Sequence, residues 1–199
     1  MASVSIDDIR KLKELTGVGL TDAKVALVEA EGDFDKALTA MRKKGLTKAE
    51  KKSDREAREG IIDSYVHSGR IGVLVEVNCE TDFVARTDNF KEFAHAIALQ
   101  VASMSPVYIS EADIPAEEIE RFRTEAKERI VAEGKPAEMA DKIVDGQVKK
   151  HFAEKVLLSQ AYIMDDTMTV ETFLKENIGK MGENIVIRQF KRIELGVND

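Results

Sequence analysis

Residues 71–86 of the chain read IGVLVEVNCETDFVAR. Apolar side chains occupy every second position from Ile71 to Val77, which is the period of a strand with one face buried against a core. Beyond this stretch, apolar residues recur at helical spacing, which predicts a helix that begins near Asp88. These residues are Phe90, Phe93, Ala94, Ile97 and Val101. The order of strand, connection and helix makes residues 71–86 the centre of the predicted fold.

The connection itself, Thr81–Val84, places an acid beside a large aromatic residue where the chain leaves the sheet. Loops on a rigid scaffold are where binding groups concentrate, so Asp82 and Phe83 form a candidate site. Phe83 either lies tucked beneath the loop or is offered to another molecule. The residues alone favour the tucked arrangement.

A small antiparallel sheet is predicted around this strand. Ile61–Val66 and Ile71–Val77 flank Ser68–Arg70, a pattern typical of a β-hairpin. Asn184–Phe190 predicts a third strand. Further helical patterns lie between the hairpin and this strand, so we expect an α+β domain in which helices cover a small antiparallel sheet.

The N-terminal part of the chain has a purely helical pattern. Ser5 and Asp8 resemble a capping box at the start of the first of three short helices, and Gly17, Gly32 and Gly45 stand where these helices are expected to end. The sequence therefore predicts a three-helix domain over 1–46, a charged, helix-prone linker over 47–59, and an α+β core domain over 60–199.

The charge of the chain is uneven. Its formal net charge is −7 and its pI about 5.2, which argues against nucleic acid as the main ligand. Arg42–Arg58 nevertheless carries eight basic and three acidic residues. RNA contact through this stretch is an alternative, but its interleaved acids and lack of aromatic residues favour a solvated helix without direct contact to nucleic acid.

The sequence contains no recognisable catalytic, cofactor or metal motif. Gly17–Asp22 superficially resembles a phosphate-binding loop, but it follows a helix and has an acid in place of the third glycine. Cys79, the single cysteine, ends an apolar strand and is expected to be a small buried hydrophobe rather than a nucleophile. The histidines His67, His95 and His151 lack ligand spacing. We therefore expect no cofactor, no metal site and no covalent chemistry.

The sequence has no apolar run long enough for a membrane span, and the N-terminus lacks the basic and apolar regions of a signal peptide. We expect a cytoplasmic protein.

Three blocks of this sequence, in order, resemble the elongation factor Ts family, the bacterial guanine-nucleotide exchange factors of elongation factor Tu. The most specific block is Gly69–Arg86. The others are Thr16–Lys24 with the residues up to Gly45, and Gly182–Phe190 with Glu194–Gly196, preceded by Leu157–Gln160. The resemblance spans nearly the whole chain.

The resemblance implies a function and a site. The resemblance implies that the N-terminal domain is similar to ubiquitin-associated domains, and that the partner is elongation factor Tu, both GDP-bound and nucleotide-free. The family's Thr-Asp-Phe-Val segment, credited with dislodging the magnesium of the partner, corresponds to Thr81, Asp82, Phe83 and Val84. In the N-terminal domain we expect a small apolar contact with a nearby cation, made by Val18, Gly19, Leu20 and Lys24.

The chain also departs from part of the family. Long members carry a second core subdomain, whereas this chain resembles the short members, which implies a homodimer. Its self-complementary surface is expected near Asn184–Phe190 or Phe152–Leu158. The family commonly has Ala and Met where this chain has Val18 and Leu20. An adaptor whose N-terminal domain binds a ubiquitin-like or helical partner is the alternative function, followed by an RNA-binding protein.

Overall fold

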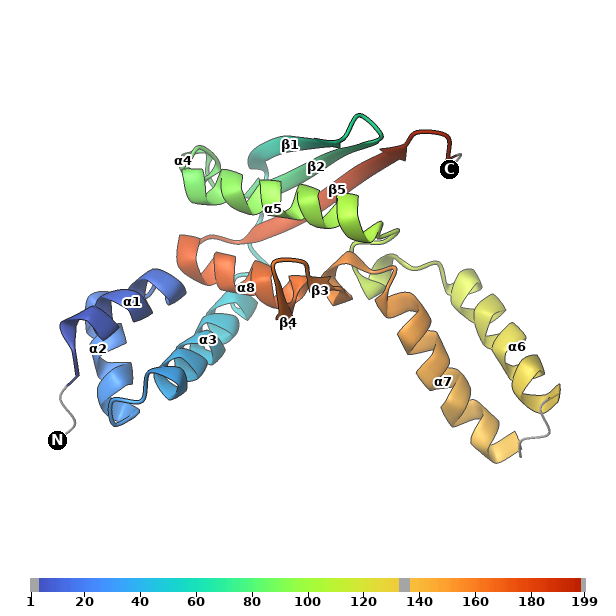
Figure 1. Ribbon diagram of the computed structural model, residues 1–199, viewed down its shortest axis with the longest axis horizontal. Coiled ribbons are helices and arrows are strands. Elements are labelled where there is room, and N and C mark those ends of the chain that lie inside the picture. Colours follow the sequence, from blue (N-terminus) through green and yellow to red (C-terminus); the bar gives the residue numbers. More distant parts are fainter. Residues whose placement is uncertain (1–3, 133–136, 198–199) are drawn as a thin grey trace. The chain divides into compact units, whose positions relative to one another are not determined.

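The computed structural model describes residues 4–132 and 137–197, with the side chains of 46–48 and 137–140 excepted. The chain divides into two compact units. One extends to Leu99 and resumes at Glu171, and the other is Gln100–Val170. Figure 1 shows the helices and strands in chain order.

The first unit begins with the predicted three helices, α1 (Ile6–Thr16), α2 (Leu20–Glu29) and α3 (Phe34–Glu50). The Ser5 hydroxyl caps α1 by accepting a hydrogen bond from the Asp8 N–H at 3.0 Å. The buried core of this bundle is small and consists of Leu12, Ala23, Ala26, Leu27, Ala37 and Met41.

Helix α3 does not end at Gly45, as the sequence pattern predicted, but continues to Glu50. A glycine inside a helix costs about 1 kcal/mol relative to alanine. Helix α8 (Val170–Met181) approaches α3 here, because a β-carbon built on Gly179 would lie 3.6 Å from the α-carbon of Gly45, whereas one built on Gly45 itself would meet nothing within 4 Å. Arg42 and Glu50 of α3 also form ion pairs with Glu176 and Lys175 of α8, so contacts with α8 accompany the continuation of α3 past this glycine.

The sheet has the predicted antiparallel strands β1 (Glu59–His67), β2 (Ile71–Cys79) and β5 (Ile185–Glu194), in the order β1-β2-β5. The hairpin and the third strand are confirmed. Strand β5 continues beyond the predicted end at Phe190. The α+β fold class is confirmed as well.

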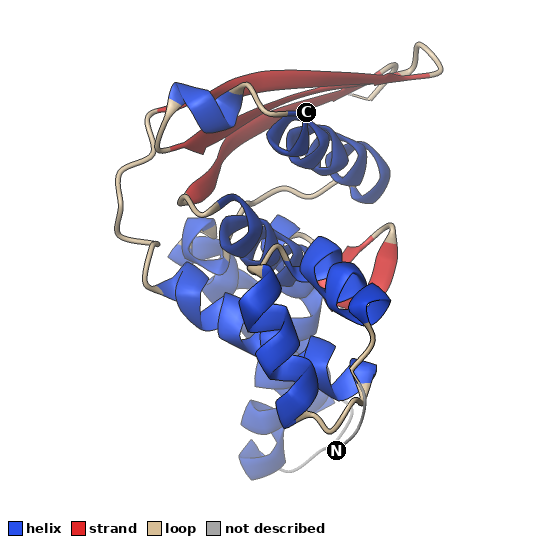
Figure 2. Ribbon diagram, turned by 90° about the vertical axis from the view of Figure 1, so that its left-hand side faces the viewer, coloured by secondary structure: helices blue, strands red, loops and turns tan. Residues whose placement is uncertain are grey.

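One face of this sheet is covered by the predicted helix α5 (Asp88–Met104), as Figure 2 shows. Helix α8 contributes to the same core, since the rings of Phe93 and Phe173 lie 5.3 Å apart. The alternating valines of β2 are buried, as are the apolar residues of α5. This core includes Val73, Val75, Val77, Phe90, Phe93, Ala94 and Ile97.

The opposite face of the sheet, which we call the open face, carries apolar side chains that are more than half exposed. They are Ile62, Val66, Leu74 and Ile193. In the strand register, Gly72 pairs with both Val66 and Ile193, and Leu74 lies two residues further along β2. These apolar side chains therefore lie on one face of the sheet.

The second unit contains α6 (Ala116–Ala132) and α7 (Ala137–Ala153), an antiparallel helical hairpin joined by the inter-helix ion pairs Arg123–Asp145 and Lys127–Asp141. It also contains two short 3-10 helices, Glu111–Asp113 and Leu157–Ser159.

A second, two-stranded sheet, β3 (Ala161–Tyr162) and β4 (Asp165–Thr169), was not predicted. Its strands are short and partly polar, and the buried Gln100 side chain holds it by accepting from the Ile163 N–H and donating to the Ala161 carbonyl.

Candidate functional site

The Thr81–Val84 segment contains a single helical turn, α4 (Asp82–Ala85), that follows β2 almost at once. Thr81 has an extended backbone and caps the turn, because its hydroxyl accepts a hydrogen bond from the Val84 N–H at 3.4 Å. Ala85 is buried and Val84 half-buried, so the turn is anchored on that side.

Phe83 points away from this anchor and is 80% exposed. The expectation of a tucked Phe83 is therefore wrong. Successive residues of a helix are separated by about 100°, so burying Val84 and Ala85 turns Phe83 toward solvent. A Phe exposed to this degree contributes little to its own core, and its burial elsewhere would stabilise a complex by roughly 1.5–3 kcal/mol.

Asp82 lies beside Phe83 and pairs with Arg86 at 2.8 Å. Both side chains are substantially exposed to solvent. Exposed pairs of this kind are worth at most about 1 kcal/mol, so the carboxylate can exchange Arg86 for a donor on another molecule at little cost.

Two acidic side chains hold the connection between β2 and α4. Glu183 Oε2 accepts hydrogen bonds from the N–H groups of Glu80 and Thr81 at 3.1 and 3.0 Å, and Glu183 Oε1 accepts one from the Thr81 hydroxyl at 2.6 Å. In the opposite direction, the Asn184 N–H donates to Glu80 Oε1 at 2.6 Å. We call this reciprocal arrangement of Glu80, Thr81, Glu183 and Asn184 the clasp.

The clasp also reaches the segment after α3. The buried Asn184 amide donates to the carbonyls of Ser53 and Arg55, and the Lys52 ammonium donates to the carbonyl of Gly182. Arg55 lies 3.5 Å from Glu80. The basic stretch is therefore not a purely solvated helix, because several of its groups bind the loops that carry the site.

Sequence reasoning did not identify Glu183 as part of the site. It lies 102 residues from Thr81 along the chain, and no local pattern links the two. The available signal was its place in a loop directly before the third predicted strand, which must pair beside β2 for the sheet to form.

Cys79 is completely buried at the end of β2, and its thiol donates to the Thr81 carbonyl at 3.1 Å. Burial, together with the nearby Glu183 carboxylate, raises the pKa of Cys79 to about 11. The thiolate, which is the reactive form, is therefore almost absent at neutral pH.

We expect native Cys79 to resist a thiol reagent such as Ellman's reagent at pH 8 and to react only after unfolding in urea. Its reaction rate should follow the unfolded fraction as urea is raised. Rapid, stoichiometric labelling of the native protein at pH 8 would contradict this account of the thiol.

Each of the three histidines has a protein partner of its own. His95 contacts Asp63 at 2.9 Å, His67 contacts the Tyr65 hydroxyl, and His151 stacks on Phe122. Within residues 4–132 and 137–197, no three His, Cys, Asp or Glu side chains gather closely enough to hold a metal ion. None of the helices in those residues is both long and apolar enough to cross a bilayer.

The second candidate region is the turn between α1 and α2. Gly17 ends α1 with φ +67°, and Gly19 begins α2. Leu20 is about half exposed and Lys24, one turn later, is exposed on α2, whereas Val18 packs partly against the core of the bundle. A leucine and a lysine are thus both presented to solvent by α2.

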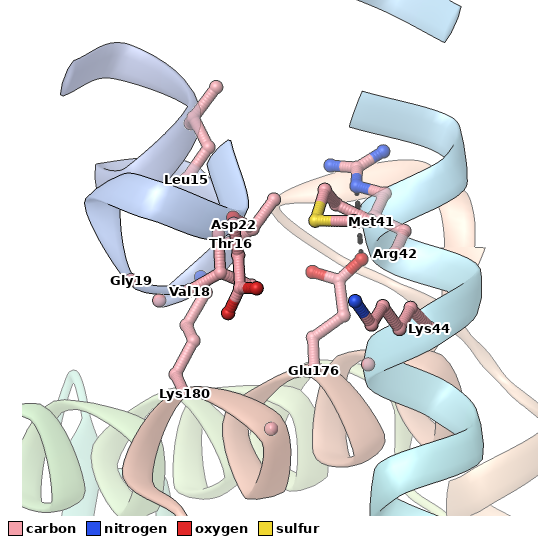
Figure 3. A pocket seen from close by; sticks show the side chains of 13 residues that line it. Leu15, Thr16, Val18, Gly19, Asp22, Met41, Arg42, Lys44, Glu176 and Lys180 are labelled. Carbon is pink, nitrogen blue, oxygen red and sulfur yellow. Dashed lines mark ion pairs between the residues drawn. The ribbon is translucent and has the colours of Figure 1, made fainter. Parts of the chain in front are cut away.

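A small hollow of about 130 Å³ lies beside this turn (Figure 3). Val18 and Gly19 line it together with residues of α3 and α8, among them Arg42 and Glu176, which form an ion pair at 3.0 Å. A β-carbon on Gly17 would lie 2.7 Å from the α-carbon of Lys180, so this position requires glycine for space as well as for its φ. The hollow lies where the turn between α1 and α2 packs against α3 and α8 within the first unit.

The model of the family described as Elongation factor TS matches residues 46–197. An elongation factor Ts of Thermoanaerobacter sp. (strain X514) is 50% identical over 97% of this chain and 95% of its own length. The elongation factor Ts of Desulfosudis oleivorans is 47% identical over 98% and 100%, and that of Herpetosiphon aurantiacus 46% over the same shares.

The chain belongs to the elongation factor Ts family. The predicted membership is confirmed, and with it the broad assignment to translation elongation. The family match covers α4, the clasp and the whole sheet, whereas α1, α2 and most of α3 lie outside it. The full-length relatives extend the similarity to the N-terminal helices.

Proposed function

We propose that this chain binds elongation factor Tu in its GDP-bound form, promotes release of GDP, and so allows GTP to enter. The observation that carries this proposal is Phe83, a large aromatic side chain 80% exposed on a turn whose N-terminal end is held by hydrogen bonds to Glu183. An exposed aromatic group on a fixed support is a typical binding hot spot. The proposed action involves no covalent chemistry and no cofactor.

The proposed target of Phe83 and Asp82 is the magnesium and phosphate site of the partner. Mg²⁺ demands near-ideal octahedral geometry and is held through waters and a few protein groups, so a small displacement of those groups weakens it. Insertion of Phe83 supplies burial energy, and Asp82, once released from Arg86, accepts hydrogen bonds that otherwise orient the ligands of the metal. Thr81 and Val84 hold this pair in place.

The turn at Val18 and Gly19, with Leu20 and Lys24 of α2, is the proposed second contact with elongation factor Tu. Exposed Leu20 offers apolar area and Lys24 a nearby positive charge, a combination suited to an amphipathic helix with acidic residues. Two separated contacts on one partner raise the effective affinity beyond that of either alone.

We further propose that the chain acts as a homodimer in the cytoplasm. Of the two surfaces considered from the sequence, the helical one near Phe152–Leu158 is disfavoured, because Phe152 and Leu157 are buried in their own unit. The open face is apolar and exposed, and it carries both Glu76 and Lys191. A two-fold axis through such a face pairs opposite charges twice, which is the symmetry of an isologous interface.

The experiment that tests the proposed function is release of fluorescent GDP from elongation factor Tu, followed with increasing amounts of this chain and excess unlabelled GDP. An exchange factor accelerates release until it saturates. A passive adaptor binds without changing the rate, and that result would overturn the proposal. Binding to RNA that weakens steeply with salt would instead favour the RNA-binding alternative.

A further inference from the structure

The four-residue helix α4 is too short to be stable by itself, because helix nucleation is unfavourable and one turn gains few hydrogen bonds. Its position must therefore be set by contacts to its ends. The C-terminal end leads into α5, whose buried Phe90 fixes it to the core. The N-terminal end at Thr81 is held by the clasp.

The clasp does not hold the sheet. The last paired residues of β2 and β5 are Cys79 and Ile185, and both are buried. The hydrogen bonds of Glu183 begin beyond this pair, at the N–H groups of Glu80 and Thr81. What the clasp fixes is thus the path of the chain from the sheet into α4.

Of the two acidic side chains in the clasp, Glu183 makes more hydrogen bonds than Glu80. Its carboxylate accepts three hydrogen bonds, two from consecutive backbone N–H groups and one from the Thr81 hydroxyl. Hydrogen bonds to an ionised carboxylate are shorter and stronger than neutral ones. The Thr81 hydroxyl, oriented by donating to Glu183, in turn accepts from the Val84 N–H and so sets the first turn of α4.

We propose that Glu183 is a positioning residue for nucleotide exchange: through Thr81 it fixes the orientation of α4 and thereby aims Phe83 at the partner. The inference rests on the proposed exchange function. Glu183 need not touch elongation factor Tu, and its action is to keep Phe83 and Asp82 in one arrangement before binding. Preorganisation of this kind lowers the cost of reaching the active geometry.

The test compares Glu183→Ala, Glu183→Gln and the control Glu171→Gln. The control removes a charge of the same kind from an exposed i,i+4 pair with Lys175 on α8. GDP release from elongation factor Tu is measured over a range of concentrations of each variant. Amide hydrogen exchange at Glu80 and Thr81 is measured on the variants alone.

For Glu183→Ala we expect the maximal release rate to fall about tenfold while the half-saturating concentration changes little. The maximal release rate with Glu183→Gln should lie between those of Glu183→Ala and the wild type, because the amide oxygen of the glutamine still accepts hydrogen bonds from the backbone. Exchange at the Thr81 amide should become faster in both, and Glu171→Gln should match the wild type in all measurements.

A folded Glu183→Ala protein with the wild-type maximal rate would overturn the inference. If Glu183→Ala does not fold, Glu183→Gln decides, since an unchanged rate together with faster Thr81 exchange would have the same meaning. A wild-type chain that fails to accelerate GDP release would instead refute the proposed function. In that case, the amide exchange of Thr81 still reports whether Glu183 holds α4.

Discussion

Replacing Phe83 with alanine is expected to lower stimulated GDP release roughly thirtyfold, the equivalent of a binding hot spot worth ~2 kcal/mol. The stability of the protein should change by less than about 0.5 kcal/mol, because Phe83 is 80% exposed and packs against nothing that its removal would leave empty. Thermal unfolding and fluorescent GDP release, measured on the same preparation, check both parts.

The matched control is Phe90→Ala, seven residues further along the chain. Phe90 is completely buried in the core beneath the sheet, so the same substitution there should cost ~3–5 kcal/mol of stability. If Phe83→Ala unfolds at a similarly reduced temperature, and its exchange activity merely follows the lost folded fraction, then Phe83 is a core residue and the proposed role fails.

Leu74→Lys is expected to convert the proposed dimer into a monomer. Leu74 is 53% exposed at the centre of the open face and pairs with Lys191 on β5. A lysine there would bring like charges together across a two-fold axis and remove apolar area from the interface. Sedimentation equilibrium should give twice the chain mass of 22.1 kDa for the wild type and one chain mass for the variant.

Val131→Lys is the control for this substitution. Val131 is similarly exposed but belongs to α6 and not to the sheet, so its replacement should leave the mass unchanged. A wild-type protein that sediments as a single chain with full exchange activity would contradict the dimer as the active form.

The sheet and the main helices could be predicted because each has a local signal. The alternation from Ile71 to Val77 marks a strand, and the apolar spacing from Phe90 to Val101 marks a helix. The β3-β4 hairpin could not be predicted, because it depends on the side chain of Gln100, distant in sequence. The continuation of α3 past Gly45 was also not predicted, and there α3 meets Gly179 of α8, which is distant in sequence.

The sequence located the candidate site, but it did not reveal the residues that hold the site in place. The pattern placed Asp82 and Phe83 in a connection between strand and helix, and the family resemblance named them. The side on which Phe83 lies could not be decided until Val84 and Ala85 were seen to face the core. Glu183 was missed because hydrogen bonds between distant loops leave no periodic trace in a single sequence.

The central claim, that this chain and GDP oppose each other on elongation factor Tu, is tested most directly by the reciprocity of their binding. The affinity of the chain for elongation factor Tu is measured with the partner nucleotide-free and with saturating GDP. Linkage requires that GDP lowers the affinity of elongation factor Tu for the chain by the same factor by which the chain lowers its affinity for GDP. The account predicts two large and equal factors. Equal affinity of the chain for both forms of elongation factor Tu would contradict it.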